Sequence, residues 1–281
     1  MAIDLSSLQT VSYRVESPGD GGIAVVSLDR ADKRNAQNNL MTYELNACYD
    51  DAARRNDVKV IVLRAEGPHF SAGHDLRDRT TPDEFARVFP QSGFTGEGQE
   101  AMMAHEEEVY FNMCWRWRNI PKPVIAAAQG KSIAGALMLL WVADIIIAAE
   151  DATFSDPVVA FGVNGVEYFG HPWEFGARKA KELLFTGDSF TAQEAMDLGM
   201  VNRVVPLDQL HDETWKLAQQ IAQMHPFALA MAKRAVNQTL DVMGQQTALQ
   251  SCFDIHQLGH ASAYAQSGQV ILTGLEGMKK G

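Results

Sequence analysis

Cysteine is scarce in this sequence. The chain of 281 residues contains only Cys48, Cys114 and Cys252, which lie far apart and form no C-x-x-C pair. Disulfide frameworks and zinc-cysteine sites need paired spacings, whereas an odd number of isolated thiols fits a reducing compartment. The sequence therefore predicts free thiols.

Positive charge is also in short supply. The chain has 24 Lys and Arg against 35 Asp and Glu, which gives a formal net charge of −11. Binding of nucleic acid requires a basic face to meet the phosphates, so we expect no nucleic-acid partner. An anionic small ligand would depend on local cations and on helix N-termini.

The sequence has no long uninterrupted hydrophobic run. A membrane-spanning helix needs roughly 20 consecutive apolar residues. The most apolar segment, IAGALMLLWVADIIIAAE, is broken by Asp144 and is better interpreted as a buried helix followed by a buried strand. The opening MAIDLSSLQT lacks the basic and apolar regions of a signal peptide. We expect a cytoplasmic protein that does not contact a membrane.

The pattern of apolar residues predicts an α/β fold. Buried strand-like runs such as IAVVSL and VKVIVLRAE end in turns and are followed by helical spacing, with Asn39 as an expected helix N-cap. Because helices separate the strands, we expect parallel strands covered on at least one face. The prediction is an α/β core over 1–205 and a helical C-terminal subdomain over 206–281. The polar stretch 80–100 is interpreted as a mobile lid or an insertion.

Two glycine-bearing breaks, HFSAGHDL and QGKSIAGALM, share a chemical design. Each follows a buried strand and precedes an expected helix start, and Asp75 and Asp78 are expected to cap the first of these helices. Small residues let a ligand approach the backbone, and amides at a helix start have no intrahelical partner. Two such amides from different loops would form an oxyanion hole. Taken singly, each motif fits tight helix-on-strand packing equally well.

The order of four segments is more specific than any one of them. SLDRADKRNA, GPHFSAGHDL, KPVIAAAQGKSIAGALMLLWVADIIIA and LLFTGDSFTAQEAMDLGMVNRVVP together resemble the enoyl-CoA hydratase/isomerase (crotonase) superfamily, over about residues 11 to 240. The resemblance implies a crotonase-like spiral of ββα repeats with a helical C-terminal trimerisation region. It also implies a homo-oligomer, either a trimer or a hexamer built as a dimer of trimers. The implied substrate is an acyl-CoA thioester, with no separate cofactor and no metal.

The resemblance assigns the thioester oxygen to the backbone N–H groups of His74 and Gly135. An enolate forming at a thioester needs charge stabilisation, which backbone amides supply without titrating. The His74 side chain is interpreted as a solvated partner of Asp75 in preference to a catalytic imidazole.

Other substrate contacts follow from the same resemblance. Ala72, in the first oxyanion segment, is expected to meet the substrate. Lys33 and Arg34 lie in the segment that resembles the one meeting the nucleotide part of CoA, although a solvated surface role fits them nearly as well.

The two glutamates of the family's hydratases are absent. By position, Met138 and Val158 stand in their places. Hydration needs a base for the water and an acid for the α-carbon, and neither of these side chains exchanges a proton. The usual two-glutamate mechanism therefore cannot operate unchanged, although both residues are expected to line the substrate site.

The glycine-rich stretch PVVAFGVNGVEYFGHPWEFG offers a replacement. Glu167 within it is a candidate acid or base, with Tyr168 or His171 as its partner, and Tyr168 is expected to line the substrate site. Desolvation among aromatic residues would raise the pKa of this carboxyl group. Alternatively, Glu167 caps a turn or pairs with Arg178. Asp156, just before the stretch, is expected to cap a turn.

Two features near the C-terminus carry weaker signals. His256 and His260 are four residues apart on an expected helix, a metal-ligand spacing, but no third ligand presents itself in the sequence. A structural or interface role is favoured for them. Lys279 and Lys280 are candidates for a contact with CoA phosphate. Two functions remain open: an enoyl-CoA hydratase/isomerase-type enzyme, or an acyl-CoA-binding protein that kept the oxyanion hole without the acid/base pair.

Overall fold

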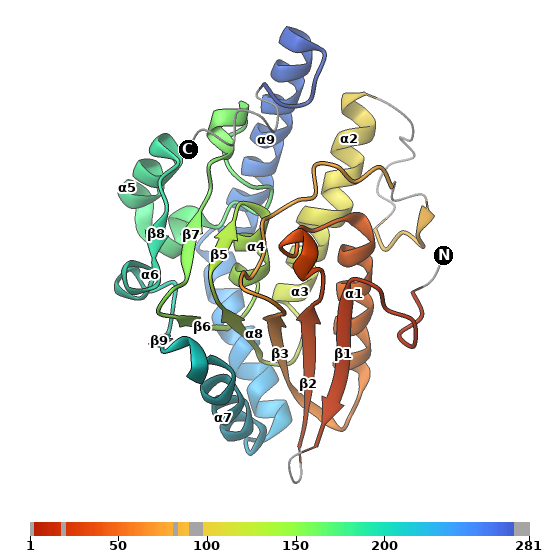
Figure 1. The fold of residues 1–281 in the computed structure, drawn as a ribbon, viewed down its shortest axis with the longest axis vertical. Coiled ribbons are helices and arrows are strands. Elements are labelled where there is room, and N and C mark those ends of the chain that lie inside the picture. Colours follow the sequence, from red (N-terminus) through yellow and green to blue (C-terminus); the bar gives the residue numbers. More distant parts are fainter. Residues whose placement is uncertain (1–2, 18–20, 81–83, 90–97, 273–281) are drawn as a thin grey trace.

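A six-stranded sheet forms the centre of the protein (Figure 1), as seen in a computed structural model that describes residues 3–17, 21–80, 84–89 and 98–272. The strand order is β1-β2-β3-β4-β6-β9. β1 pairs with β2 in antiparallel fashion, and every other pairing in this sheet is parallel. The strands are β1 (Val11–Glu16), β2 (Gly22–Leu28), β3 (Val58–Ala65), β4 (Val124–Ala128), β6 (Ile145–Ala149) and β9 (Arg203–Val205).

The main sheet is covered on both faces, which explains its continuous apolar runs. Side chains along β2 point alternately to the two faces of the sheet. Ala24, Val26 and Leu28 pack in one core with helix α1 (Asn39–Arg54). Val25 faces the opposite core, where helix α7 (Leu210–Ala222) contributes Leu217 and Ala218. The predicted parallel arrangement is confirmed, whereas the antiparallel edge strand β1 was not foreseen.

The start of α1 differs from the prediction. Its N-cap is Asn38, whose side chain accepts a hydrogen bond from the Met41 N–H at 3.1 Å. Asn39 is instead the first helical residue, and its N–H donates to the Asp78 carboxylate at 2.8 Å. Asp78 thus serves the N-terminus of α1, because the residues that directly follow His74 form turns and not the helix that we expected there.

The repeating unit of the fold is two strands followed by a helix. β4 leads to β5 (Lys131–Ile133) and helix α4 (Gly135–Trp141), and β6 leads to β7 (Thr153–Ser155), the short turn η4 (Val158–Phe161) and helix α5 (His171–Thr186). β5, β7 and β8 (Phe190–Thr191) form a second, three-stranded sheet, after which helix α6 (Ala192–Leu198) begins with a capping box. The ends of these units meet where β5 and β7 lie side by side.

One long helix contains a π-helical turn. It runs through α2 (Gln99–Glu106), the π segment η3 (Glu107–Asn112) and α3 (Met113–Arg118). A π turn holds an extra residue per turn and frequently occurs at functional sites. Within it, the buried Glu108 carboxylate accepts hydrogen bonds from the Tyr43 hydroxyl at 2.7 Å and the Val88 N–H at 2.8 Å. Much of the proposed lid at 80–100 falls outside the described residues.

The C-terminal part is helical, as predicted. It comprises η5 (Leu207–Gln209), α7, α8 (Pro226–Val242) and α9 (Gln245–Ser267), and the long α9 lies beside α2 and α8 (Figure 1). α9 packs Phe253 against Phe111, whereas α8 buries none of its residues and leaves Phe227, Val236 and Val242 exposed. The trimerisation role and the division at residue 205 stay predictions. In the described chain, no helix is long and apolar enough to cross a membrane.

Candidate active site

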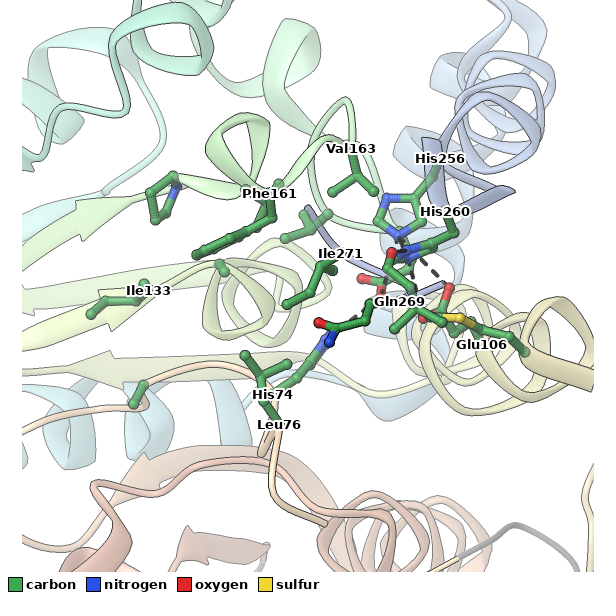
Figure 2. Close-up of a pocket in the computed structure, with 18 of the residues that line it drawn as sticks. His74, Leu76, Glu106, Ile133, Phe161, Val163, His256, His260, Gln269 and Ile271 are labelled. Carbon is green, nitrogen blue, oxygen red and sulfur yellow. Dashed lines mark hydrogen bonds and ion pairs between the residues drawn. The ribbon is translucent and has the colours of Figure 1, made fainter. Parts of the chain in front are cut away.

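A cavity of about 540 Å³ lies between the oxyanion loops, the loop after β7 and the C-terminal helix. Figure 2 shows apolar side chains such as Ile133 and Phe161 at one end and titratable side chains at the other. Residues of the loop that follows β7, from Pro157 to Glu167, line part of this cavity, as the sequence suggested. The cavity is lined by Ala72, His74, Leu76, Arg79, Met102, Glu106, Ile133, Ala134, Pro157, Val158, Phe161, Val163, Val166, Glu167, His256, His260, Gln269, Val270 and Ile271.

The two oxyanion segments touch one another. A Cβ added to Gly73 would lie 2.6 Å from the Ile133 carbonyl oxygen and 3.3 Å from the Gly135 nitrogen, so only glycine allows this approach. Ala134, just before α4, adopts a left-handed φ of 49°, a conformation that costs energy for a residue with a side chain. Such strain persists only where the surrounding structure enforces it.

Hydrogen bonds on either side of His74 hold its backbone in place, while the His74 N–H makes no hydrogen bond within the described structure. Gln37 donates its N–H to the Gly73 carbonyl and accepts from the Asp75 N–H, both at 2.8 Å. These two bonds bracket His74, and neither its N–H nor that of Gly135, the first residue of α4, donates a hydrogen bond to any described group. The arrangement leaves two adjacent donors for an oxygen atom of a ligand.

The His74 side chain is mostly buried, with 17% of its surface exposed, and does not pair with Asp75, which corrects the interpretation made from the sequence. Its ring stacks on Tyr110 with centroids 3.8 Å apart, and its Nδ1 lies 3.5 Å from the Glu167 carboxylate. Asp75 pairs instead with Arg30, at 3.0 Å. Burial, reinforced by the nearby His256 and the other histidines, lowers the pKa of His74 to about 3. The imidazole is therefore neutral at neutral pH.

Glu167 lies inside the cavity with 3% of its surface exposed. Its Oε1 faces His74 and also lies 3.8 Å from the His256 Nε2, while its Oε2 has no hydrogen-bond partner among the described residues. Burial, and then the neighbouring charge of Glu106, raises the pKa of Glu167 well above its ordinary value. Burial therefore favours the protonated form of this carboxyl group.

The partners suggested for Glu167 from the sequence are not the ones observed. His171 donates from its Nε2 to the Asp156 carboxylate at 2.8 Å. Asp156 also accepts from the Val158 N–H two residues on, at 3.4 Å, which is the turn-capping bond that was predicted, and from the Val166 N–H at 3.0 Å. The close polar contacts of Glu167 in the described structure are with His74 and His256 and not with Arg178.

The other predicted substrate residues divide into two groups. Ala72 and Val158 line the cavity, whereas Met138 is buried in the core, where its sulfur accepts from the Tyr168 N–H at 3.3 Å. Tyr168 faces a separate cavity with Trp141. Neither Met138 nor Tyr168 lines the candidate site, because both side chains pack behind it.

Lys33 and Arg34 lie next to the oxyanion segment but outside the cavity. The exposed Lys33 pairs with Asp32 at 3.5 Å. Arg34 has a left-handed φ of 54°, and its carbonyl accepts from the Ala72 N–H at 2.9 Å. Their loop therefore supports the first oxyanion segment through its backbone, while a CoA contact by the two side chains stays a prediction. Lys279 and Lys280 fall outside the described residues.

Several residues of the site were missed or misjudged from the sequence. His256 and His260, for which a structural role was favoured, both line the cavity, and Glu106 supplies the third ligand-type side chain that the sequence did not reveal. Tyr110 was missed as well. The histidine spacing was the only available signal, because Glu106 sits in an acidic run, HEEE, whose members look alike in sequence.

Comparisons with known proteins fit this geometry. The sequence model of the family described as Enoyl-CoA hydratase/isomerase matches residues 19–271. The chain is 46% identical over 255 residues to "Putative enoyl-CoA hydratase EchA13" of Mycobacterium tuberculosis, covering 88% of this chain and 80% of that protein.

Solved structures agree with the family match. A "probable enoyl-CoA hydratase" from Mycobacterium smegmatis superimposes with a TM-score of 0.85 at 50% identity, covering 94% of this chain and 99% of that one. An enoyl-CoA hydratase/isomerase from Xanthobacter autotrophicus Py2 gives a TM-score of 0.77 at 30% identity, covering 93% and 95%. This chain belongs to the enoyl-CoA hydratase/isomerase family and has the crotonase-like fold that its motifs predicted.

Proposed function

We propose that the protein is an enzyme acting on an enoyl-CoA thioester, with the N–H groups of His74 and Gly135 binding the thioester oxygen. Glu167 transfers the proton. The observation that carries this proposal is the position of Glu167: its carboxyl group is buried in the same cavity as the two oxyanion segments, 3.5 Å from the His74 ring. One of its oxygens has no hydrogen-bond partner among the residues that the structure describes. Preorganised donors of this kind stabilise a developing enolate, each contributing roughly 10²–10³ in rate.

The protonation states support an acid role for Glu167. A carboxyl group that keeps its proton can deliver it to the α-carbon of an enolate. The His74 ring beside it stays neutral because its pKa is lowered to about 3, so it is a neighbour of the acid and not the base of the reaction. Hydration needs both an acid and a base, whereas migration of the double bond needs only one group that removes a proton from one carbon and returns it to another. Both reactions proceed through the same enolate.

The experiment compares the wild-type protein with Glu167→Gln on a panel of enoyl-CoA thioesters. Loss of the conjugated chromophore reports hydration or migration, and incorporation of deuterium from D₂O shows which carbon is protonated. Glu174→Gln is the matched control, because Glu174 is a partly buried glutamate that lines the separate cavity with Tyr168 and Trp141. We expect turnover to fall about 10²–10⁴-fold for Glu167→Gln, the range typical of a lost general acid, and to persist in the control.

A binding protein is the competing function, favoured by Met138 and Val158 at the two usual glutamate positions. It predicts saturable binding of acyl-CoA without turnover on any member of the panel, in the wild-type protein as in both variants. Turnover that survives Glu167→Gln unchanged would remove Glu167 from the mechanism.

A further inference from the structure

The titratable end of the cavity contains a cluster that the proposed reaction does not use. Glu106, His256 and His260 are buried, each with 6% or less of its surface exposed. The two His Nε2 atoms lie 2.8 Å apart, and the Glu106 carboxylate oxygens lie 3.7 Å from the first and 3.5 Å from the second. Figure 2 shows the three side chains converging on one point beside the cavity.

The hydrogen bonds of the two rings fix which nitrogen carries the proton. The Nδ1 of His256 lies 2.6 Å from the Gly165 carbonyl oxygen, and the Nδ1 of His260 lies 2.6 Å from the Val270 carbonyl oxygen. A carbonyl oxygen can only accept, so each Nδ1 carries a hydrogen and donates it. In the neutral rings, each Nε2 then presents a bare lone pair.

Two lone pairs facing one another at 2.8 Å repel. A cation at this point, either a proton or a metal ion, would hold the rings together. Neutral imidazole is the form that binds a metal, and a histidine ligand almost always donates its other ring N–H to a carbonyl or carboxylate. Both rings have that arrangement.

The carboxylate is oriented in the same way. Gln257 donates from its side-chain nitrogen to Glu106 Oε2 at 2.6 Å, and Gln99 in turn donates to the Gln257 side-chain oxygen at 3.0 Å. Such outer contacts fix the direction of a ligand carboxylate. In a tetrahedral zinc site with metal–ligand bonds of about 2.0–2.1 Å, neighbouring ligand atoms lie about 3.3 Å apart. The two nitrogens are closer than this, at 2.8 Å, and the contacts of 3.7 Å and 3.5 Å are made by different oxygens of Glu106. One ligand atom from each of the three residues lies within 4.8 Å of the other two, so small side-chain shifts would bring them around one ion.

The chain brings these ligands together from separate segments. His256 and His260 are one turn apart on α9, on the face turned toward the cavity, and Glu106 is the last residue of α2 before the π turn. After α9 the chain reverses at Gly268, which has a left-handed φ of 68°, and this reversal carries the Val270 carbonyl back to His260.

We propose that Glu106, His256 and His260 bind a first-row divalent transition metal ion of the zinc type, with an open coordination position facing the cavity. Two imidazole ligands favour zinc and its neighbours over calcium or magnesium, which prefer oxygen ligands. Three protein ligands and one open position are the arrangement of catalytic zinc sites. Glu167, whose Oε1 lies 3.8 Å from the His256 Nε2, stands beside that position.

The test measures metal binding directly. The full-length protein is purified and its metal content is determined by mass spectrometry. It is then stripped with a chelator and titrated with Zn²⁺ by calorimetry and with Co²⁺ by visible absorption. We expect one ion per chain and a Co²⁺ spectrum typical of nitrogen and oxygen ligands in four or five coordination. A protein that takes up no stoichiometric Zn²⁺ and gives only the spectrum of hydrated Co²⁺ overturns the proposal without any variant.

Four variants sharpen the result. His260→Gln and Glu106→Gln remove a ligand and are expected to abolish stoichiometric binding, while His171→Gln, at a buried histidine paired with Asp156, should leave it unchanged. Gln257→Leu removes only the bond that orients Glu106, so we expect affinity to fall about 10–100-fold, as is typical for such partners. Circular dichroism confirms folding. Unchanged Zn²⁺ affinity in a folded His260→Gln variant contradicts the proposal, as does an imidazole proton shared between the two rings in nitrogen-15 NMR spectra of the zinc-treated protein.

This proposal stands apart from the proposed reaction. Metal stoichiometry is measured without substrate, and Glu167→Gln is expected to retain the ion even where it loses turnover. An active protein that binds no metal overturns the metal site alone, whereas a zinc-binding protein without turnover on the panel overturns only the reaction.

Discussion

The packing of His74 on Gly135 leads to a prediction whose sign depends on a second residue. A Cβ added to Gly135 would lie 2.3 Å from the His74 Nε2 and 2.4 Å from its Cδ2. Ordinary contact begins at 3.4 Å, so the ring would have to move by 3.4 − 2.3 = 1.1 Å. It cannot retreat freely, because Tyr110 stacks on it with centroids 3.8 Å apart.

The energies follow from two opposing effects. Overpacking a well-filled site costs about 1–3 kcal/mol, whereas replacing glycine by alanine in a helix gains up to about 1 kcal/mol. Gly135 has no left-handed φ, so alanine meets no backbone strain there. Gly135→Ala should therefore lower the free energy of unfolding by up to about 2 kcal/mol. In a His74→Ala background the clash is gone, and the same substitution should be neutral or stabilising.

The assay is a double-mutant cycle in urea with the wild-type protein, the two single variants and the double variant. Residues in contact show coupling, and we expect a coupling free energy of about 1–3 kcal/mol. Binding of acyl-CoA measured on the same four proteins shows whether the displaced ring blocks the oxyanion segment. Additive effects, within about 0.5 kcal/mol, would refute the packing argument.

Three further predictions concern other parts of the molecule. Burial raises the pKa of Glu174 to about 7, above the unfolded value of 4.5, so its contribution to stability is complete below pH 4.5 and is lost as the pH rises through 7. Between pH 4 and pH 8, the free energy of unfolding of Glu174→Gln in urea should therefore rise by up to about 3 kcal/mol relative to that of the wild type. Free energies of unfolding that change with pH in parallel for the two proteins would contradict this. Burial raises the pKa of Cys48 to about 12 and that of Cys114 well above its ordinary value, so a thiol reagent should modify the half-buried Cys252 first and all three only after unfolding. Rapid modification of three thiols in the native protein would be the opposing result. Val242, 89% exposed at the end of α8, should lie in a subunit interface if the protein is a trimer or hexamer. Val242→Asp is then expected to shift sedimentation toward the monomer, whereas a wild-type monomer would rule that assembly out.

The elements of the fold were largely accessible from the sequence, because they depend on local patterns. Buried runs of β-branched residues marked the central strands, and glycines marked the two oxyanion segments, where close backbone approach leaves no room for a side chain. The N-cap of α1 was misplaced by one residue because Asn38 and Asn39 are chemically the same, and only the tertiary contact with Asp78 distinguishes them.

The site was less predictable, since it depends on which residues meet across the chain. Glu167 was found because the usual glutamate positions held Met138 and Val158, and a search for a remaining carboxylate led to the adjacent loop. The orientation of the His74 ring could not be foreseen, because it is set by Tyr110, 36 positions along the chain on a different element. Glu106 escaped notice for the same reason: nothing local separates it from Glu107 and Glu108.

The π turn at Glu107–Asn112 makes the site sensitive to a change of length by one residue. An α-helix turns about 100° per residue, so deleting one residue from this turn would restore regular α-helix and rotate all of α2 by about that angle relative to α3. Glu106 would then swing away from His256 and His260, while Trp117 and the core beneath it stayed in place. The loss of one residue here would thus remove Glu106 from the cavity while leaving the central sheet undisturbed.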